Sequence, residues 1–483
     1  MKKILYAAAE CAPFIKTGGL GTVVGAVPGE LCRQGLDVRV ILPAYECIDR
    51  KWKDQMVKIM DYPVRIGWRV QTATLYELDY HGVRHYLVGN SFYFSGDRPY
   101  ADPWLDIEKF SFFARAVLEM LSYQDYLPDV IHCHDWHTGL LPVYLRTEYD
   151  RDPFYKKIRT VMTIHNLKFQ GVTDMDHMKD VTGLPDQLFT YDKLEFHGRG
   201  NVLKGGLVFA DKITTVSSTY AAEILQPEYG EGLSDLLQYR KDDVSGIVNG
   251  IDTGIYNPAS DPAIRTRYDI SNFRKGKKEN KRALQEKTGL PEDSSVFTIA
   301  IISRLTEQKG FDLLIPILAG LLSEKVQLYV LGGGEARYEG VFSAARAAYP
   351  DSLYTQFDYE DSMAKLMYAG CDAVLMPSLF EPCGLNQLMA FRYGTVPVVR
   401  LTGGLVDTVK AYQEKKSTST GFGFTEYSAK ALSACLQEAM DLYYGKRRAW
   451  DAIARRCMQE DYSWDKQAQE YLRLYESIRD RLL

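Results

Sequence analysis

The segment VFTIAIISRLTEQKG, residues 296–310, determines the fold class. Its first part, 296–302, is apolar except for Thr298, and such runs are typical of strands in a parallel sheet covered on both faces. The polar and charged residues that follow indicate a loop at the carboxyl end of the strand, where open α/β sheets bind their ligands. The segment therefore predicts a doubly wound α/β unit with a binding loop directly after this strand.

Similar apolar runs recur along both halves of the chain, with helical patterns between them. The predicted strands are 4–8, 38–42, 130–134, 160–165 and 212–216 in the first half, and 296–302, 326–332, 373–376 and 396–399 in the second. Asn249-Gly250 and the nearby Pro258 interrupt any regular pattern between the halves. We therefore predict domains at 1–246 and 247–460, and a last segment, 461–483, with an amphipathic helix from Trp464.

Composition and charge restrict the class of partner. The 483 residues are 46% hydrophobic and 25% charged, as in an ordinary globular chain of more than one domain. The net charge of -5 and the pI near 6.0 provide no positive field for nucleic acid or for an anionic membrane. These values favour small molecules or neutral polymers as partners and leave the oligomeric state open.

A basic run, 274–282, contains six Lys or Arg residues and one Glu. It precedes an amphipathic helical pattern. Because the chain as a whole is acidic, we interpret the run as a solvated surface stretch rather than as a site for a polyanion.

The N-terminus and the cysteines predict the compartment. The opening residues MKKILY indicate a first strand, because Glu10 interrupts the apolar stretch and no cleavage-like tail follows. No stretch is long and apolar enough to cross a bilayer. The eight cysteines are dispersed without a CxxC pair, which suits a reducing compartment. We expect a cytoplasmic protein without disulfides.

The tetrapeptide Thr-Gly-Gly-Leu occurs twice, at 17–20 and at 402–405. A glycine pair before a helix start leaves backbone N–H groups uncovered and lets a ligand approach closely, as in phosphate and sugar binding at helix N-termini. Because the two copies lie far apart in the chain, we expect a ligand held between the two halves.

Two further segments follow predicted strands of the second half. In SRLTEQKG, Arg304 can form a forked contact with a diphosphate and Lys309 adds a point charge, so the pair offsets the charge of a leaving nucleotide diphosphate. In FEPCGLNQ, Gly384 and Leu385 offer N–H groups to phosphate oxygens, and Glu381 can accept hydrogen bonds from sugar hydroxyls. For each segment alone, the alternative is a solvated charge or a helix cap.

Histidines at two strand ends admit more than one interpretation. In HCHDWH, His132 and His134 face one side of a strand and suggest a metal site, but no second set of ligands matches them. Strand-end His134 and Trp136 suit sugar contacts equally well. In TIHN, His165 and Asn166 also end a strand, where a lone histidine can be simply packed. No G-x-G-x-x-G follows the first strand and no P-loop lysine motif occurs, which argues against dehydrogenase and P-loop functions.

Together these segments resemble the bacterial glycogen synthases, which are related to plant starch synthases and have the GT-B glycosyltransferase architecture. The resemblance covers nearly the whole chain. The matching segments are KTGGLG at 16–21, HDWH at 134–137, TIHN at 163–166, LEF at 194–196, TTVS at 214–217, NGID at 249–252, Arg304 with Lys309, EPCGL at 381–385, RYGTVP at 392–397 and SW at 463–464. It implies two doubly wound, Rossmann-like domains that face a deep cleft, with a C-terminal helix that crosses back to the first domain.

The resemblance also implies the reaction. Glucose would be transferred with retention from a nucleotide diphosphate glucose, usually ADP-glucose in bacteria, to the 4-hydroxyl at the non-reducing end of an α-1,4-glucan. The acceptor would be glycogen or a maltooligosaccharide, and UDP-glucose stays open as the donor. No metal and no other cofactor is implied.

Residue roles follow from the same resemblance. The expected catalytic residues are the diphosphate-binding pair Arg304 and Lys309, Glu381 beside the donor glucose, His165 against the transferred glucose, and Asp106 just ahead of a helix over 110–121. The expected substrate contacts are Lys16, Gly18, Gly19, Asn249, Tyr359, Cys383, Gly384, Leu385, Thr402, Gly403, Gly404, His134, Trp136 and Asn166. Among these, Lys16 and its glycines match the loop that reaches the donor from the first domain, and Tyr359 matches an aromatic residue that stacks on the base.

One position departs from the family. The residue after Gly-Leu-Gly is usually Asp, and here it is Thr22. Threonine can still cap the following helix, but a charge-assisted hydrogen bond to sugar or acceptor would be weakened. Two other interpretations therefore stay open: a catalytically weakened or non-catalytic glucan-binding protein, and a related transferase with a non-glucan acceptor.

Overall fold

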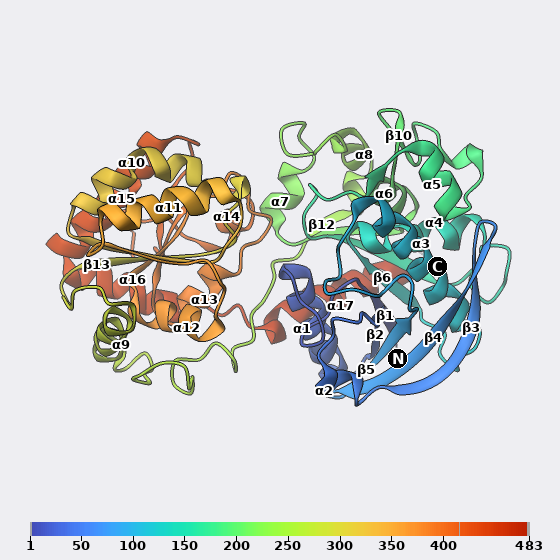
Figure 1. Cartoon of the computed structure of the whole chain (residues 1–483), viewed down its shortest axis with the longest axis horizontal. Coiled ribbons are helices and arrows are strands. Elements are labelled where there is room, and N and C mark those ends of the chain that lie inside the picture. The colour runs from blue at the N-terminus through green and yellow to red at the C-terminus, as the bar shows by residue number, and fades with distance from the viewer. Residues whose placement is uncertain (1, 415, 481–483) are drawn as a thin grey trace. The chain divides into compact units, whose positions relative to one another are not determined.

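The computed structural model describes residues 2–414 and 416–480, and the chain forms two compact units (Figure 1). The first unit contains the chain up to Val216, Ala221–Ile247 and the chain from Trp464, and the second contains Ser217–Tyr220 and Val248–Ser463. The principal change of unit, between 247 and 248, falls beside the Asn-Gly break noted in the sequence.

In the described part of the chain, the first unit is built on a nine-stranded sheet with the order β12-β11-β7-β6-β1-β2-β5-β4-β3. Its strands are β1 (Lys3–Ala7), β2 (Asp37–Pro43), β3 (Val57–Ile66), β4 (Arg69–Tyr80), β5 (Val83–Gly89), β6 (Val130–His134), β7 (Arg159–Ile164), β11 (Lys212–Thr215) and β12 (Val244–Gly246). Neighbours pair in parallel from β12 to β5, whereas β3, β4 and β5 pair antiparallel. The five strands predicted in this half are confirmed within one residue at each end.

The described residues of the second unit form a six-stranded sheet with the order β15-β14-β13-β16-β17-β18, parallel throughout. Its strands are β13 (Phe297–Ile302), β14 (Val326–Leu331), β15 (Leu353–Gln356), β16 (Ala373–Met376), β17 (Val396–Arg400) and β18 (Phe422–Phe424). In chain order this arrangement is 3-2-1-4-5-6, the order of dinucleotide-binding doubly wound sheets. The four strands predicted in this half are confirmed, again within one residue at each end.

Helices cover both faces of the second sheet. Figure 1 shows α10, α11, α14 and α15 on one side and α9, α12, α13 and α16 on the other. The helices are α1 (Gly19–Arg33), α2 (Arg50–Lys53), α3 (Pro103–Leu121), α4 (Leu140–Thr147), α5 (Met175–Thr182), α6 (Val202–Phe209), α7 (Ser218–Glu223), α8 (Ser234–Tyr239), α9 (Phe273–Thr288), α10 (Phe311–Ser323), α11 (Ala336–Ala348), α12 (Asp361–Gly370), α13 (Asn386–Arg392), α14 (Gly404–Thr408), α15 (Ala429–Gly445), α16 (Arg447–Gln459) and α17 (Trp464–Asp480). Short strands β8 (Val172–Thr173), β9 (Glu195–Phe196) and β10 (Arg199–Asn201) form a separate small sheet.

The strand order locates the binding loops of each unit. Strand order reverses beside the first strand of a doubly wound sheet, and the loops there leave a crevice at the carboxyl ends of the strands. In the first unit this point lies between β1 and β6, and in the second between β13 and β16. The loops after these four strands carry most of the sequence motifs, and TIHN and the second Thr-Gly-Gly-Leu segment lie at the ends of the adjacent strands β7 and β17.

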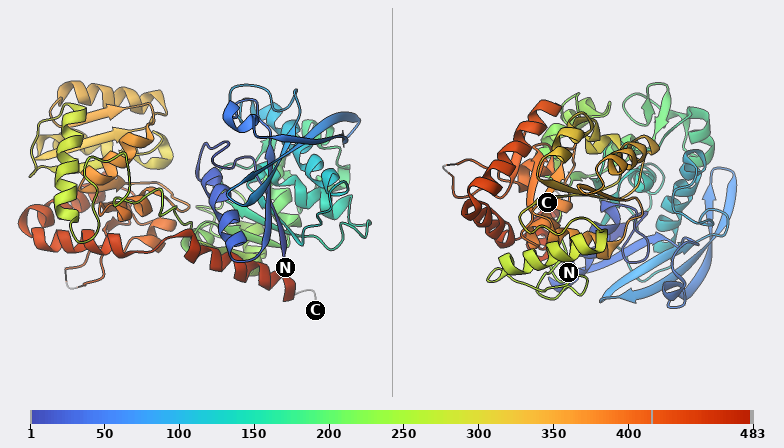
Figure 2. Two further views of the ribbon diagram at one scale, coloured as in Figure 1. Left: turned by 90° about the horizontal axis from the view of Figure 1, so that it is seen from below. Right: turned by 60° about the vertical axis from the view of Figure 1, so that its left-hand side comes forward.

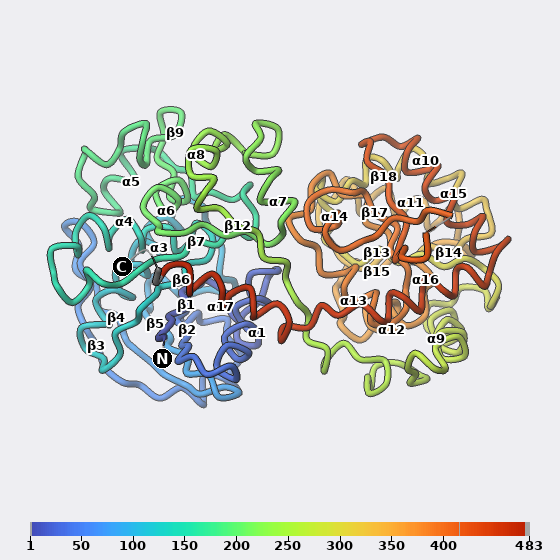
Figure 3. Tube along the Cα trace, turned by 180° about the vertical axis from the view of Figure 1, so that it is seen from behind, coloured from blue at the N-terminus to red at the C-terminus, as the bar shows by residue number. Residues whose placement is uncertain are grey.

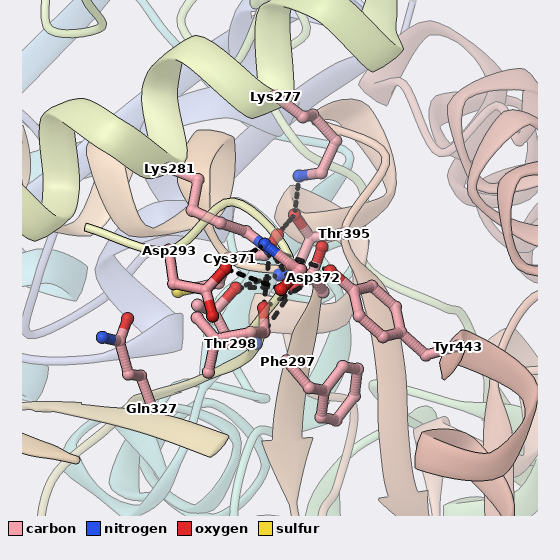
Figure 4. Close-up of polar contacts among 12 residues, drawn as sticks. Lys277, Lys281, Asp293, Phe297, Thr298, Gln327, Cys371, Asp372, Thr395 and Tyr443 are labelled. Carbon is pink, nitrogen blue, oxygen red and sulfur yellow. Dashed lines mark hydrogen bonds and ion pairs between the residues drawn. The ribbon is translucent and has the colours of Figure 1, made fainter. Parts of the chain in front are cut away.

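In the basic run at 274–282, four of the six Lys and Arg residues are exposed, as the sequence predicted, and the other two lysines are partly or fully buried. The run lies inside α9, and Lys281 is buried with its Nζ 2.5 Å from Asp372 Oδ2 (Figure 4). Lys277 Nζ donates to Thr395 Oγ1 at 2.7 Å, and burial lowers the pKa of Lys277 to about 7. Lys277 and Lys281, on one face of α9, therefore form hydrogen bonds inside the second unit. The sequence could not indicate these contacts because the partner residues lie far along the chain.

The C-terminal helix α17 packs on the first unit (Figures 2 and 3). Tyr475 OH lies 2.7 Å from Tyr6 OH on β1 and 2.7 Å from His132 Nδ1 on β6. The helix predicted from Trp464 is thus present to the end of the described chain, and its last predicted residues, 481–483, lie outside the described residues.

All eight cysteines are free thiols. Among the described residues, no helix is long and apolar enough to cross a membrane.

Candidate active site

The loop after β1 carries Lys16 and the first glycine pair, and the Glu10 carboxylate holds this loop in place. Glu10 accepts hydrogen bonds from Thr17 N and Thr17 Oγ1, both at 2.6 Å, and from Gly18 N at 3.3 Å. Tyr100 OH donates to the same carboxylate at 2.7 Å. Because charge-assisted bonds are the stronger kind, Glu10 fixes the backbone that carries Lys16. Sequence reasoning missed Glu10, although a carboxylate just beyond a predicted strand was a signal for it.

The glycine pair itself is open, as a ligand loop requires. A Cβ atom built on Gly18 or Gly19 meets no heavy atom of the described residues within 4 Å. Because α1 begins at Gly19, Thr22 lies inside its first turn, and the expectation that Thr22 caps the helix is wrong. Thr22 Oγ1 instead donates to Gly18 O at 3.5 Å, a long bond back to the preceding turn.

A second group lies at the ends of the neighbouring strands β6 and β7. Asp135 has a positive φ of 55°, an uncommon backbone conformation that occurs often at functional sites. Its Oδ1 accepts a hydrogen bond from His165 N at 2.7 Å. Burial raises the pKa of Asp135 to about 7, although the backbone N–H groups of His165 and Asn166 oppose the shift. Asp135 therefore fixes the main chain at His165, a role that sequence reasoning did not assign.

The structure changes the role of His134. This side chain is fully buried and its Nδ1 lies 2.9 Å from His165 Nε2, so it supports His165 and the predicted direct substrate contact is not supported. His165 keeps 9% of its surface exposed, and Trp136 and Asn166 are half-buried. No group of three or more His, Cys, Asp or Glu side chains in the described chain has a metal-binding arrangement, so the metal interpretation of the histidine cluster finds no support.

Asp106 lies in the first turn of α3, not ahead of the helix as the sequence suggested. Its Oδ1 accepts a hydrogen bond from Lys109 Nζ at 2.6 Å, and Lys109 Nζ also donates to Pro99 O at 2.9 Å. Burial raises the pKa of Asp106, and Lys109 opposes that shift. Burial and then the charges of Glu10 and Asp106 raise the pKa of Tyr45. Asp106 and Glu10 thus act in the same direction on one buried hydroxyl.

The second unit brings the two predicted motifs together. Lys309 Nζ lies 2.7 Å from Glu381 Oε2, and Ser378 Oγ donates to the same oxygen at 3.0 Å. The Lys309 side chain is 21% exposed and that of Glu381 7%. Arg304 is exposed at the carboxyl end of β13. A pair of cations with one buried carboxylate therefore lies at the point where this sheet reverses its strand order.

Close backbone contacts hold these loops together. Gly310 has a φ of 71°, and a Cβ atom built on it would lie 2.0 Å from Pro377 O. Gly404 N donates to Glu381 O at 3.0 Å, and a Cβ atom on Gly404 would lie 2.3 Å from Cys383 O. Only glycine fits at either position. These close contacts hold the loop after β13 and the second Thr-Gly-Gly-Leu segment against the loop after β16.

The remaining predicted contacts of the second unit differ in exposure. Thr402 and Cys383 are buried, and burial raises the pKa of the Cys383 thiol to about 12. Gly384 and Leu385 are half-buried just before α13, and Gly403 has a positive φ of 48°.

Two further predicted contacts of this unit lie apart from those loops in sequence. Asn249 is buried, and its Oδ1 has no hydrogen-bond partner within the described residues. Tyr359 is 62% exposed, so its ring has a face available for stacking on a ligand.

The sequence is similar to those of known proteins along nearly its whole length. Residues 3–239 match the family model described as starch synthase catalytic domain, and residues 280–456 match that of glycosyl transferases group 1. The glycogen synthase of Lachnoclostridium phytofermentans is 48% identical, with 99% of this chain and 100% of that protein covered. That of Bacillus subtilis is 44% identical, with 99% and 98% covered. The chain belongs to the glycogen synthase family.

Solved structures agree with this membership. The catalytic domain of starch synthase IV from Arabidopsis thaliana, bound to ADP and acarbose, superimposes with a TM-score of 0.90 at 30% identity, covering 99% of each chain. The sucrose-phosphate synthase of Thermosynechococcus elongatus, at 16% identity and a TM-score of 0.64, shares the fold. As a glycogen synthase family member, this protein is a glycosyltransferase with the two-domain GT-B fold, and the non-catalytic alternative is not favoured.

Proposed function

We propose that this glycogen synthase family protein transfers glucose, with retention, from ADP-glucose to the non-reducing end of an α-1,4-glucan such as glycogen. The observation that carries the proposal is the Lys309–Glu381 ion pair, which joins the loop after β13, where Arg304 is exposed, to the loop after β16. Family membership and the ADP and acarbose in the related starch synthase support the donor and the glucan acceptor. UDP-glucose is the alternative donor.

The charges of the second unit suit a leaving nucleoside diphosphate. Arg304 and Lys309 carry two positive charges against one on Glu381, so the group has net positive charge before the donor binds. A diphosphate that gains negative charge as the glycosidic bond breaks is stabilised by such fixed cations. Arg304 can contact two phosphate oxygens at once. Glu381 orients the Lys309 ammonium and offers an acceptor to a sugar hydroxyl.

The first unit supplies the contacts to the hexose in this proposal. Lys16 is exposed and the backbone of Gly18 and Gly19 is open, which suits contacts with sugar hydroxyls, and Glu10 keeps that loop in one conformation. His165 lies against the transferred glucose. The leaving diphosphate accepts the proton of the acceptor hydroxyl, so no side chain is required as a covalent nucleophile.

We further propose that the reaction takes place in the cytoplasm and needs no metal or other cofactor. Eight free cysteines suit a reducing compartment. Arg304 and Lys309 supply the positive charge that a metal ion provides in other phosphate-transferring sites. Tyr359 is the candidate for stacking on the nucleotide base.

The test is transfer of labelled glucose to glycogen by wild type and by Lys309→Gln. Loss of one charge-assisted contact to the leaving group predicts a decrease of kcat by about a hundredfold, equivalent to roughly 2.7 kcal/mol. The matched control is Lys446→Gln, which breaks an exposed ion pair of 2.5 Å with Glu414 on the same unit and leaves kcat unchanged. Equal activity of Lys309→Gln and wild type would contradict the assignment of this site.

A further inference from the structure

Two histidines share one hydrogen bond beneath the candidate sugar site. The distance between His134 Nδ1, at the end of β6, and His165 Nε2, after β7, is 2.9 Å. His134 is fully buried, and its ring stacks on that of His132 with centroids 4.5 Å apart. Because a hydrogen bond contains one proton, one of the two facing nitrogens donates and the other accepts.

The far side of His134 determines the direction of this bond. Its Nε2 is buried and has no hydrogen-bond partner among the residues described. If His165 donated through Nε2, a neutral His134 would carry its own proton on Nε2, and a buried N–H group would have no acceptor. If His134 donates through Nδ1, its Nε2 is only an unprotonated lone pair. Orphaned buried N–H groups are rarer than unsatisfied acceptors, so the second arrangement is favoured.

Both rings are neutral near neutral pH. Burial lowers the pKa of His165 to about 3. Burial, followed by the neighbouring His132 and His165, lowers the pKa of His134 well below its usual range. A neutral imidazole carries a single proton. A His165 ring that accepts at Nε2 therefore carries its proton on Nδ1.

We propose that His134 is a positioning residue that fixes His165 in the Nδ1–H tautomer, so that His165 presents a hydrogen-bond donor to the hexose. The surroundings hold both partners in register. Asp135 Oδ1 binds the backbone N–H of His165 at 2.7 Å, and Thr138 Oγ1 accepts a hydrogen bond from His134 N at 2.7 Å. The inference rests on the proposed function, which places His165 against the transferred glucose, where a ring N–H suits a hydroxyl oxygen.

The tautomer is measured directly by NMR of protein labelled with 15N in the histidine rings. The His165 signals are assigned by their loss in His165→Gln. We expect a protonated, pyrrole-type Nδ1 and an unprotonated, pyridine-type Nε2 at pH 7, without titration from pH 5 to pH 8. An Nε2–H tautomer or an imidazolium at pH 7 would overturn the inference, whatever the activity.

Variants of His134 connect the tautomer with the reaction. His134→Leu removes the donor, so we expect mixed His165 tautomers and a decrease of kcat by about tenfold, with little change in the donor KM. His134→Asn keeps an amide N–H near the position of Nδ1, and we expect it to retain the Nδ1–H signal and more of the activity. If His134→Leu does not fold, His134→Asn and the wild-type spectrum still test the proposal. An unchanged His165 tautomer in a folded His134→Leu would contradict it.

The matched control makes the same change at another buried histidine of the first unit. His85 Nδ1 lies 2.9 Å from Val83 O, outside the candidate site, and we expect His85→Leu to leave the His165 tautomer and kcat unchanged. The His165 tautomer and the transfer activity test this inference and the proposed function separately. An Nδ1–H His165 in a protein that transfers no glucose would contradict the proposed function alone. An Nε2–H His165 in an active enzyme would contradict this inference alone.

Discussion

Replacing Lys281 with methionine tests how the second unit holds the strand that leads to Glu381. Lys281 Nζ donates to Asp372 Oδ2 at 2.5 Å, to Val296 O at 2.9 Å and to Tyr443 OH at 3.0 Å. All three hydrogens of the ammonium are therefore used, and the two charged side chains are 4% and 5% exposed. Asp372 directly precedes β16, and the loop after β16 carries Glu381, the carboxylate that pairs with Lys309.

The expected loss of stability follows from these contacts. Removing the lysine leaves a buried carboxylate without its counter-charge, a change that costs roughly 3–5 kcal/mol in comparable pairs. Asp372 Oδ2 still accepts hydrogen bonds from Thr298 N at 3.0 Å and from Thr298 Oγ1 at 2.8 Å. Methionine also resembles the lysine stem in volume and leaves no large cavity. We therefore expect the lower end of the range, about 3 kcal/mol.

Native-state hydrogen exchange of the β13 and β16 amides measures this loss within the second unit, without assuming that the whole chain unfolds in one step. The control is Lys278→Met, an exposed lysine on the same helix, which we expect to exchange like wild type. Adding Asp372→Asn to Lys281→Met removes the buried negative charge that has lost its partner, and should restore part of the lost stability. Exchange in Lys281→Met that matches the control would refute the reasoning.

The pH dependence of the same comparison has a defined sign. Lys281 and other contacts lower the pKa of Asp372 against the effect of burial, so the stability from this carboxylate is present above its unfolded pKa of about 4 and is lost as the pH falls. Asp372 raises the pKa of Lys281 against burial, so the lysine's contribution is lost only as the pH rises above its ordinary 10.5. The difference between wild type and Lys281→Met should therefore be constant near neutral pH and decrease in acid.

Two further predictions concern the start of α1 and the loop that precedes it. Thr22→Asp should raise kcat/KM for glucose transfer and stabilise α1 by about 0.3–1 kcal/mol through the helix dipole. The first turn of α1 has no acidic side chain in the described chain, and the present hydrogen bond from Thr22 to Gly18 O is long at 3.5 Å. An unchanged rate would show that this position does not limit the reaction. Glu10→Gln weakens the hydrogen bonds to Thr17 and should lower kcat/KM by about tenfold. The control is Glu46→Gln, because the Glu46 carboxylate accepts a hydrogen bond from Gly96 N at 3.2 Å. Equal effects of the two substitutions on kcat/KM would contradict the role of Glu10.

Buried parallel strands were predictable from the sequence because their apolar runs are continuous. Strands β3 and β4 were missed because they pair antiparallel and β3 alternates exposed and buried residues, so no continuous run marks them. Strand β5, which pairs antiparallel with β4 but parallel with β2, was missed because Arg84 and His85 interrupt its apolar run. Val57, the first residue of β3, is 59% exposed. The assignment of Ser217–Tyr220 to the second unit could not be predicted from the sequence either, because it depends on tertiary contacts. One of these is the hydrogen bond that Thr219 Oγ1 donates to Asp407 Oδ1 at 2.6 Å.

Site residues were predictable where a motif follows a strand, and less so where a role depends on tertiary contacts. The ion pair between Lys309 and Glu381 joins two motifs that both follow strands at the reversal of the sheet order, so the sequence could place them near each other. Burial of His134 and Lys281 could not be read from the sequence, because the partner of each lies on a distant segment. Glu10 was missed because its position just beyond a predicted strand does not by itself distinguish a carboxylate that holds a loop from one on the surface.

The most direct test of the account is glucose transfer by the purified full-length chain, with labelled ADP-glucose and labelled UDP-glucose each offered with glycogen. We expect label in a product that an α-1,4-specific glucanase digests, at a higher rate from ADP-glucose and without added metal. No incorporation from either donor, in a protein shown to be folded, would contradict the central claim.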